Sequence, residues 1–206
     1  MIFGNRTMKM KKISAVILSV CAMFAMSGTS YAAVIKNTMA SVSPGPTAGS
    51  SYSNARIYVS KRNHVLSLYE GGSVTGEWPC NVGTYSAEGD KKTEGDSTTP
   101  SGKFYVCTRN DQSICYKAFG VSYPSTDDAQ RGLESGLITM DQFDEIRSAI
   151  ARRQQPLWNT PLGGFIEIHG GYEEGGTTHG CVAVDNSVMD ILWDKCPMGT
   201  TIEIGP

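Results

Sequence analysis

The 206-residue sequence predicts a mainly β domain, a mixed sheet or sandwich, with a helical insertion and a short helix near its C-terminal end. Short runs that alternate apolar and polar residues, separated by turn residues, are typical of strands. The 23 glycines favour many tight turns. The hydrophobic period becomes helical only within residues 125–157 and again after residue 185. The length suits one domain rather than two.

The strand pattern recurs along the chain from residue 55 onward. We expect strands at residues 55–59, 64–69, 74–82, 103–108, 116–121, 165–168 and 200–204. The polar, glycine-rich segment 84–103 is predicted to be a long loop that ends in the turn Thr99–Gly102, and such a loop is either a functional lid or disordered. Its Gly-Asp pairs do not recur at the positions of a calcium-binding loop, so we assign no metal to it.

Three helices are expected. The first covers residues 127–138, and the second covers 141–153 after a capping box at Thr139–Gln142. A third follows Asp185 or Asn186, either of which can cap it.

The N-terminus has the three parts of a secretory signal peptide. An apolar run, Ile13–Met26, precedes the small-x-Ala motif Ser30-Tyr31-Ala32, and both follow four basic residues, Arg6, Lys9, Lys11 and Lys12. The apolar run is too short to span a membrane. We therefore expect a signal peptide at residues 1–32, a flexible linker at 33–54 and one catalytic domain at 55–206. The processed protein would have no stable membrane anchor and would lie in the periplasm or cell wall.

The charge of the processed chain is acidic. Four of the 18 basic residues and none of the 20 acidic ones lie in segment 1–32, which leaves 14 against 20, a net charge of −6. This balance argues against nucleic acid as a partner. A polymer that carries both amines and carboxylates is compatible with it.

Five cysteines follow the predicted signal peptide: Cys80, Cys107, Cys115, Cys181 and Cys196. An odd number in an exported protein indicates at least one free thiol, and the context of Cys181 singles it out. The other four either form two disulfides or stay as buried thiols. A Cys107–Cys115 pair is slightly favoured because the two flank a polar segment.

The stretch from His169 to Asn186 carries the candidate chemistry. A strand-like run ends at His169-Gly170, and a glycine-rich loop then leads to Thr178-His179-Gly180-Cys181. A thiol beside an imidazole can act as a nucleophile, and a helix start nearby would favour a thiolate or an oxyanion. A zinc site is disfavoured because the cysteine and histidine spacings match no zinc motif, and no cofactor is expected. A purely structural turn is the alternative interpretation.

This stretch resembles the signature of the L,D-transpeptidase (YkuD) catalytic domain family. The matching features are His169-Gly170, the motif Thr178–Cys181, the apolar Val182 and Asn186 five places after the cysteine. The turns Thr99–Gly102 and Thr160–Gly163 also resemble family landmarks, so the likeness covers roughly residues 55–204.

The resemblance implies an exported enzyme that acts on peptidoglycan stem peptides. Cys181 would be the nucleophile and His169 the general base, oriented by the carbonyl of Gly170. His179 would bind the donor or support the site, with an exchange of roles between the two histidines left open. Thr178, Gly180 and Asn186 would shape the substrate-binding turn. The resemblance also implies acylation by carbapenem-type inhibitors.

Two features depart from the family pattern. Ala183 stands where the family commonly has Arg, and the loop between His169-Gly170 and the cysteine motif is short. Ala183, the loop at residues 89–102 and Tyr123-Pro124 before the helical insertion are similar to a hydrolase-like sub-branch of the same fold. Transfer to an amine, with cross-linking or remodelling of the wall, and hydrolysis as an L,D-carboxypeptidase or related amide hydrolase therefore both stay open, beside a non-catalytic wall-binding protein.

Overall fold

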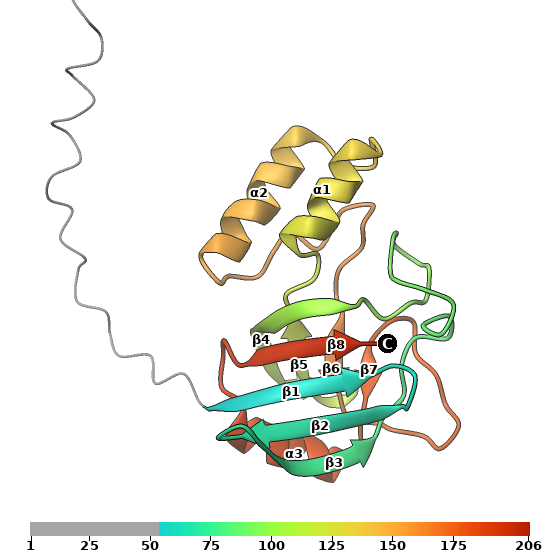
Figure 1. Cartoon of the computed structure of the whole chain (residues 1–206), viewed down its shortest axis with the longest axis vertical. Helices are drawn as coiled ribbons and strands as arrows, with labels where there is room; N and C mark the ends of the chain where they lie inside the picture. Colours follow the sequence, from blue (N-terminus) through green and yellow to red (C-terminus); the bar gives the residue numbers. More distant parts are fainter. Residues whose placement is uncertain (1–53) are drawn as a thin grey trace, which may run out of the picture. The chain divides into compact units, whose positions relative to one another are not determined.

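The computed structural model describes residues 54–206, so the predicted signal peptide and nearly all of the predicted linker lie outside the described residues. Within this range the chain forms one mixed, eight-stranded sheet with three helices (Figure 1). The strands are β1 (Ala55–Ser60), β2 (Val65–Glu70), β3 (Ser73–Pro79), β4 (Gly102–Ser113), β5 (Tyr116–Val121), β6 (Glu167–His169), β7 (Val182–Ala183) and β8 (Thr201–Gly205). The helices are α1 (Thr126–Glu134), α2 (Met140–Ala151) and α3 (Asn186–Lys195). The predicted mainly β class is confirmed.

The strand order is β3-β2-β1-β8-β4-β5-β6-β7. The C-terminal strand β8 lies in the middle, parallel to β1 and antiparallel to β4. At one edge β6 pairs antiparallel with β5 and parallel with β7. The sheet thus brings segments from the beginning, middle and end of the domain together, and it places the two shortest strands, which carry the candidate site, at its edge.

The main core lies between one face of the sheet and helix α3. Alternate residues of the strands point to this face, and they include Ile57, Phe119, Ile168 and Ile202, each fully buried. Helix α3 adds Val188, Met189 and Leu192 to the same cluster. Asp185 caps the helix by accepting a hydrogen bond from the Ser187 N–H, as predicted.

Helices α1 and α2 form the predicted insertion and pack on each other beside the sheet (Figure 1). Each begins with a capping box, at Ser125 for α1 and at Thr139 for α2, and the second was expected from the sequence. The pair has an apolar cluster of its own, made of Ala129, Ile138, Ile146 and Leu162. No helix of residues 54–206 is long and apolar enough to cross a membrane.

Ile146→Ala tests how much the apolar cluster of α1 and α2 contributes to the stability of the domain. Ile146 is fully buried, so truncation leaves a cavity and lowers the free energy of unfolding by about 2–4 kcal/mol. Urea denaturation measures the change. Met140→Ala, at an exposed position of the same helix, is the matched control and changes the stability by less than about 0.5 kcal/mol. Equal effects of the two substitutions would contradict the assigned core.

The structure corrects several details of the predicted elements. Strand β4 continues to Ser113, well beyond residue 108, and the edge strand β7 was not predicted. His64 lies in the turn before β2, exposed, rather than within a strand. Because β7 separates Cys181 from α3, the cysteine is not at the start of a helix, and the expected assistance from helix N–H groups is wrong.

All five cysteines of residues 54–206 are free thiols. The favoured Cys107–Cys115 disulfide is therefore wrong. Cys107 lies on β4 six residues before the strand ends at Ser113, a span of roughly 20 Å, and Cys115 lies in the turn beyond. A disulfide needs Cα atoms about 4–7 Å apart. The long β-hairpin, which was interpreted as a polar loop, keeps the two thiols apart.

Candidate active site

Cys181 lies at the start of β7, directly after a glycine that the local backbone requires. Gly180 has φ +129°, and a Cβ there would lie 3.0 Å from the Thr98 carbonyl oxygen. Cys181 is half-buried, and its sulfur lies 3.5 Å from the carbonyl oxygen of Phe165. The thiol thus points back over the beginning of β6.

His169 and Cys181 belong to neighbouring parallel strands. The register pairs Ile168 with Val182 and His169 with Ala183. Continued by one position, it sets Glu167 beside Cys181. Since side chains alternate between the two faces of a sheet, Glu167, His169 and Cys181 share one face, while Ile168 and Val182 point into the core. The candidate nucleophile and base therefore lie on the same face, opposite helix α3.

The imidazole of His169 is held by the backbone that follows it. Its Nδ1 lies 2.6 Å from the carbonyl oxygen of Gly170, which leaves Nε2 for the thiol. Gly170 is buried, and a Cβ there would lie 2.4 Å from Asn186 Oδ1 and 2.8 Å from the Cys115 carbonyl oxygen. The Asn186 side chain accepts the Gly171 N–H at 3.0 Å. Asn186 thus fixes the turn after His169, and its side-chain oxygen serves the backbone rather than a ligand.

Two threonines fix the backbone at Cys181. Thr178 Oγ1 donates to the Cys181 carbonyl oxygen at 2.7 Å and accepts the Gly180 N–H at 3.1 Å. Thr99 Oγ1 donates to the same carbonyl oxygen at 3.4 Å and accepts the Gly83 N–H at 2.8 Å. Thr178 therefore shapes the turn, as expected, and Thr99 ties the turn to the loop that precedes β4.

The segment between β3 and β4 also pairs with the outer edge of β7. Asn81 and Ala183 exchange both backbone hydrogen bonds, at 2.9 and 3.0 Å. The buried Asn81 side chain contacts the loop between His169 and Cys181: its amide donates to the carbonyl oxygens of Glu173 and Gly176 and accepts the Glu173 N–H. Sequence reasoning missed Asn81, which lies in a run interpreted as an apolar strand. No local signal distinguishes it.

Burial raises the pKa of the Cys181 thiol to about 11. The Glu167 carboxylate and Cys115 raise the pKa further, whereas the Glu167 backbone N–H and Lys91 lower it. At neutral pH the resting group is therefore a thiol, and a thiolate requires proton transfer to a base. His169, which lies on the neighbouring strand and on the same face, is the candidate for that base.

His179 contacts the loop before β4 instead. It is exposed, and its Nδ1 is 3.3 Å from the hydroxyl of Ser97 in the loop before β4. In the part of the chain that the structure describes, no three His, Cys, Asp or Glu side chains lie close enough together to hold a metal ion.

The residue whose carbonyl contacts the Cys181 sulfur, Phe165, packs its ring on another aromatic residue. Phe165 has φ +55°, an uncommon conformation for an aromatic residue, and its side chain is 65% exposed. Its ring centroid lies 4.9 Å from that of the buried Trp158. The sequence had placed Phe165 at the start of a regular strand, so the exposure of its side chain was missed.

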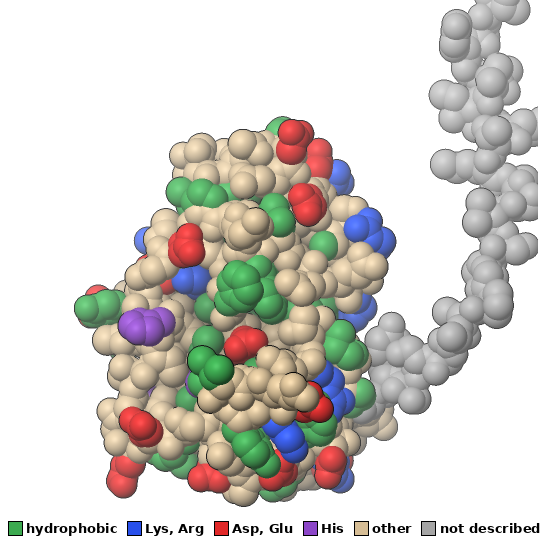
Figure 2. All heavy atoms as spheres, turned by 180° about the vertical axis from the view of Figure 1, so that it is seen from behind, with side chains coloured by type: hydrophobic (Ala, Val, Ile, Leu, Met, Phe, Trp, Pro, Cys, Tyr) green, Lys and Arg blue, Asp and Glu red, His purple; other side chains and the backbone are tan. Residues whose placement is uncertain are grey.

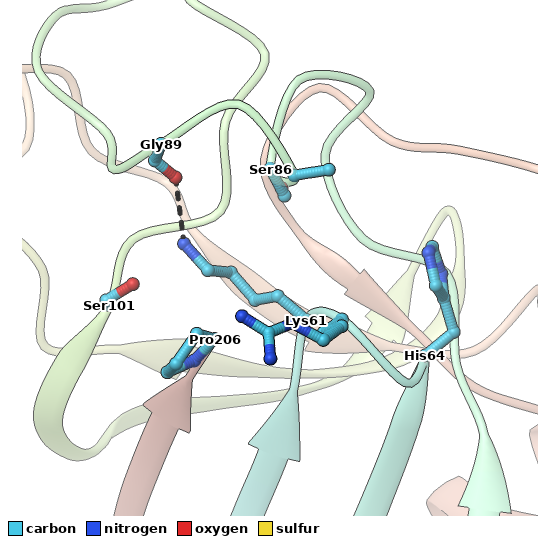
Figure 3. A pocket seen from close by; sticks show the side chains of 8 residues that line it. Lys61, His64, Ser86, Gly89, Ser101 and Pro206 are labelled. Carbon is cyan, nitrogen blue, oxygen red and sulfur yellow. Dashed lines mark hydrogen bonds between the residues drawn. The ribbon is translucent and has the colours of Figure 1, made fainter.

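A separate cavity of about 300 Å³ lies behind the loop of residues 84–101 (Figure 3). Lys61, Arg62, His64 and Pro206 line it, and neither Cys181 nor His169 does. The buried Lys61 ammonium donates to the carbonyl oxygens of Gly89 and Thr99, both at 3.1 Å, and burial lowers its pKa. Lys61 thus anchors the loop whose Thr99 side chain contacts Cys181.

Thr178→Val tests the turn before Cys181. The substitution keeps the shape of the side chain but removes both hydrogen bonds, which costs about 1–3 kcal/mol of folding free energy because the groups it served stay partly buried. We also expect Cys181 in the folded variant to be alkylated at a different rate from Cys181 in the parent. The rate is measured by digesting the alkylated protein and quantifying the peptide that contains Cys181 by mass spectrometry. Thr178→Ser keeps the hydroxyl and is the control. If both variants behave like the parent, the hydroxyl does not hold the turn.

The fold agrees with the comparisons to known proteins. A family model described as the L,D-transpeptidase catalytic domain matches residues 54–204. The chain belongs to this family. No curated protein sequence matches the chain significantly.

Solved structures share the L,D-transpeptidase fold. Bd1075 of Bdellovibrio bacteriovorus is 23% identical with a TM-score of 0.50, over 77% of this chain and 50% of that one. The helical cell shape determining protein Pgp2 of Campylobacter jejuni is 21% identical with a TM-score of 0.50, over 75% and 48%. An L,D-transpeptidase of Xylanimonas cellulosilytica is 20% identical with a TM-score of 0.45, over 76% and 63%. The chain thus spans about half to two thirds of these proteins, and identities this low show the fold alone.

Proposed function

We propose that this L,D-transpeptidase family member is an exported acyltransferase that acts on peptidoglycan stem tetrapeptides. The observation that carries the proposal is the shared face of β6 and β7, on which His169, oriented by the Gly170 carbonyl, accompanies the Cys181 thiol. A thiol of raised pKa beside an oriented imidazole is the arrangement that general-base activation requires.

The chemistry proceeds in two steps. His169 Nε2 accepts the thiol proton as Cys181 Sγ attacks the carbonyl carbon of the third stem residue. The C–S bond forms, the C–N bond to D-alanine breaks, and the proton passes from the imidazole to the departing amine. A thioester acyl-enzyme results. An amine acceptor then attacks the thioester, a new amide forms and the thiol is restored.

The oxyanion of each tetrahedral intermediate needs N–H donors. The Gly180 N–H is already used by Thr178 Oγ1. The N–H of Cys181 itself is therefore the donor that we propose for this role. Because Thr178 and Thr99 both hold the Cys181 carbonyl, the peptide unit at the nucleophile is fixed before substrate binds.

Hydrolysis is the second candidate, and one residue favours it. Ala183 is buried, pairs with His169 on one side and with Asn81 on the other, and offers no charged group near the nucleophile. With water as the acceptor, the same thioester gives L,D-carboxypeptidase activity. The acyl-enzyme is common to both outcomes.

Incubation with purified tetrapeptide muropeptides tests the proposal. Dimers indicate transfer, and monomers shortened by D-alanine indicate hydrolysis. Cys181→Ala abolishes both products, while Cys115→Ala, the other half-buried thiol, retains them. Intact-protein mass spectrometry with a carbapenem provides a second readout, an adduct on Cys181. No product and no adduct from the parent enzyme would refute the acyltransferase proposal.

Export is also proposed, from the signal peptide expected at residues 1–32. Edman sequencing of protein recovered from the cell envelope gives an N-terminus at Ala33 if cleavage follows Ala32. The processed chain would be acidic overall, but its charges are mixed: Figure 2 shows Asp, Glu, Lys and Arg side chains interspersed on one face of the molecule. Recovery of only the unprocessed chain, inside cells, would contradict export.

A further inference from the structure

A groove of about 600 Å³ lies on the outer face of β1, β2 and β3, the face that points away from helix α3. In Figure 1 these strands lie in front of α3, and no other labelled element covers them. The residues that line the groove come from the three strands and the turn between β1 and β2; they include Tyr58, Asn63, His64, Ser67, Tyr69 and Glu77. The volume is in the range of ligand sites, and the proposed chemistry does not use this groove.

Two tyrosine rings in the groove are held in place by their neighbours. The ring of Tyr58 lies over Gly205 of β8, where an added Cβ would be 2.8 Å from the tyrosine hydroxyl oxygen. The Arg56 guanidinium stacks on the Tyr69 ring, 3.9 Å from its centroid, and is itself fixed by an ion pair with Glu203 at 3.3 Å. The two rings are half-buried and are diagonal neighbours in the register of β1 and β2. They therefore offer two preorganised flat surfaces to a ligand.

The polar groups of the groove are neutral or acidic, and most of them are available. Among residues 54–206, the two tyrosine hydroxyls, the Asn63 amide and the His64 ring have no hydrogen-bond partner. The buried Ser67 hydroxyl donates to one oxygen of Glu77 at 3.0 Å, which leaves the other oxygen as an acceptor. No Lys or Arg is among the described residues that line the groove.

This combination of groups distinguishes between classes of ligand. An anionic polymer needs Lys or Arg, and a lipid needs a wall of aliphatic side chains, to which Val65 and Pro79 alone contribute among the described lining residues. A pyranose ring has a face of C–H groups that stacks on an aromatic ring, and an edge of hydroxyls that donate and accept hydrogen bonds. Two aromatic surfaces among amide, imidazole, hydroxyl and carboxylate groups therefore fit a neutral saccharide chain.

The groove leads toward the candidate active site along one segment of chain. Pro79, at the end of β3, lines the groove, and Asn81, two residues later, lies on the same face and pairs with Ala183 of β7. Cys181 precedes Ala183 by two positions and shares its face. By strand spacing, the Cα atoms of Pro79 and Cys181 are roughly 15 Å apart, a distance that a short extended peptide can span.

We propose that this groove binds a neutral glycan of linked pyranose rings, with Tyr58 and Tyr69 stacking against the sugars. Glycan binding is independent of the proposed acyl transfer and adds a second ligand site to the domain. The identification of this glycan with the strand that carries the stem peptides rests on the proposed function. A strand held in the groove would raise the effective concentration of its stem peptides at Cys181.

Calorimetric titration of the purified protein with chitotetraose, a neutral N-acetylglucosamine oligomer without any peptide, tests the groove. We expect a Kd of about 0.1–1 mM, as for a small ligand in an open site. Tyr58→Ala and Tyr69→Ala each weaken binding about tenfold, the effect of a lost aromatic contact. Tyr58→Phe keeps the ring and stays within about threefold of the parent. Tyr85→Ala, at an exposed position of the loop before β4, is the matched control and binds like the parent.

Circular dichroism checks that each variant is folded. If a tyrosine variant unfolds, Asn63→Ala decides, because this exposed side chain contacts no other described residue through a hydrogen bond and its loss weakens binding by about 3–10-fold. No binding at about 10 mM chitotetraose, or equal binding by the parent and the folded variants, would overturn the proposal. Self-association of the parent that Tyr69→Ala abolishes would instead assign the face to a second copy of the chain.

A kinetic comparison tests the link to the stem peptides. The parent has a KM about tenfold lower for a tetrapeptide carried on a glycan than for the free tetrapeptide, and Tyr58→Ala removes this difference without changing kcat. Equal KM values in the parent would contradict the link. If the parent converts neither substrate, the acyltransferase proposal fails, and the chitotetraose titration alone decides whether the groove binds a glycan.

Discussion

His169→Gln lowers the rate of Cys181 acylation at pH 7 by about 10²–10⁴-fold, the usual contribution of a positioned general base. The thiol has a pKa of about 11, so without the imidazole roughly one molecule in 10⁴ carries a thiolate at pH 7. That fraction increases about tenfold for each pH unit. The residual rate of the variant therefore rises steadily between pH 7 and pH 9, whereas the parent enzyme gains much less.

The measurement is acyl-enzyme formation, followed by intact-protein mass spectrometry across this pH range. His179→Gln is the matched control, since that ring is exposed and bonded to Ser97 rather than held against β7. Its loss is expected to be less than about tenfold. A larger loss in His179→Gln than in His169→Gln would reverse the two histidine roles.

Gly170→Ala is expected to have the second-largest effect, about 100-fold on acylation, because a small displacement of a catalytic group is enough for such a loss. The new methyl group would overlap Asn186 Oδ1, at 2.4 Å, and the Cys115 carbonyl oxygen, at 2.8 Å. The backbone must shift, and the Gly170 carbonyl then leaves His169 Nδ1. Thermal unfolding of the variant, followed by circular dichroism, also occurs at a lower temperature.

Gly171→Ala provides the control for backbone strain. Gly171 has φ +84°, so alanine is strained there, but no atom lies within 4 Å of the added Cβ. Its stability falls by about 1 kcal/mol while its acylation rate changes little. Full acylation activity in Gly170→Ala would show that the carbonyl does not orient the imidazole.

Local patterns predicted most of the scaffold. Alternating apolar residues gave β1, β2, β5 and β8 within a residue or two, and the cap at Thr139 gave the start of α2. Strand β7 has only two residues, and an alternation of apolar and polar residues cannot be recognised over so short a run. Its existence depends on pairing with β6 and with Asn81, contacts between distant segments that a single sequence does not display.

In the candidate site, too, local patterns revealed some residues, whereas contacts between distant segments hid others. Cys181 and His169 lie in one short stretch, so residue chemistry made them candidates, and the family resemblance added the role predicted for Gly170. Asn81 and Thr99 approach the motif from loops about 80–100 residues earlier in the chain.

The burial of the cysteines also governs how the protein withstands oxidation. Burial raises the pKa of Cys80, Cys107 and Cys196 to about 12 each. Thiol–disulfide exchange and peroxide attack both require the thiolate, which is present at neutral pH in roughly one molecule in 10⁵ at such a site. These three thiols are therefore protected by packing alone, without disulfides. Cys115 and Cys181 are only half-buried, so we expect oxidants to modify these two thiols first. Oxidative damage would then strike the proposed nucleophile before it disturbed the fold.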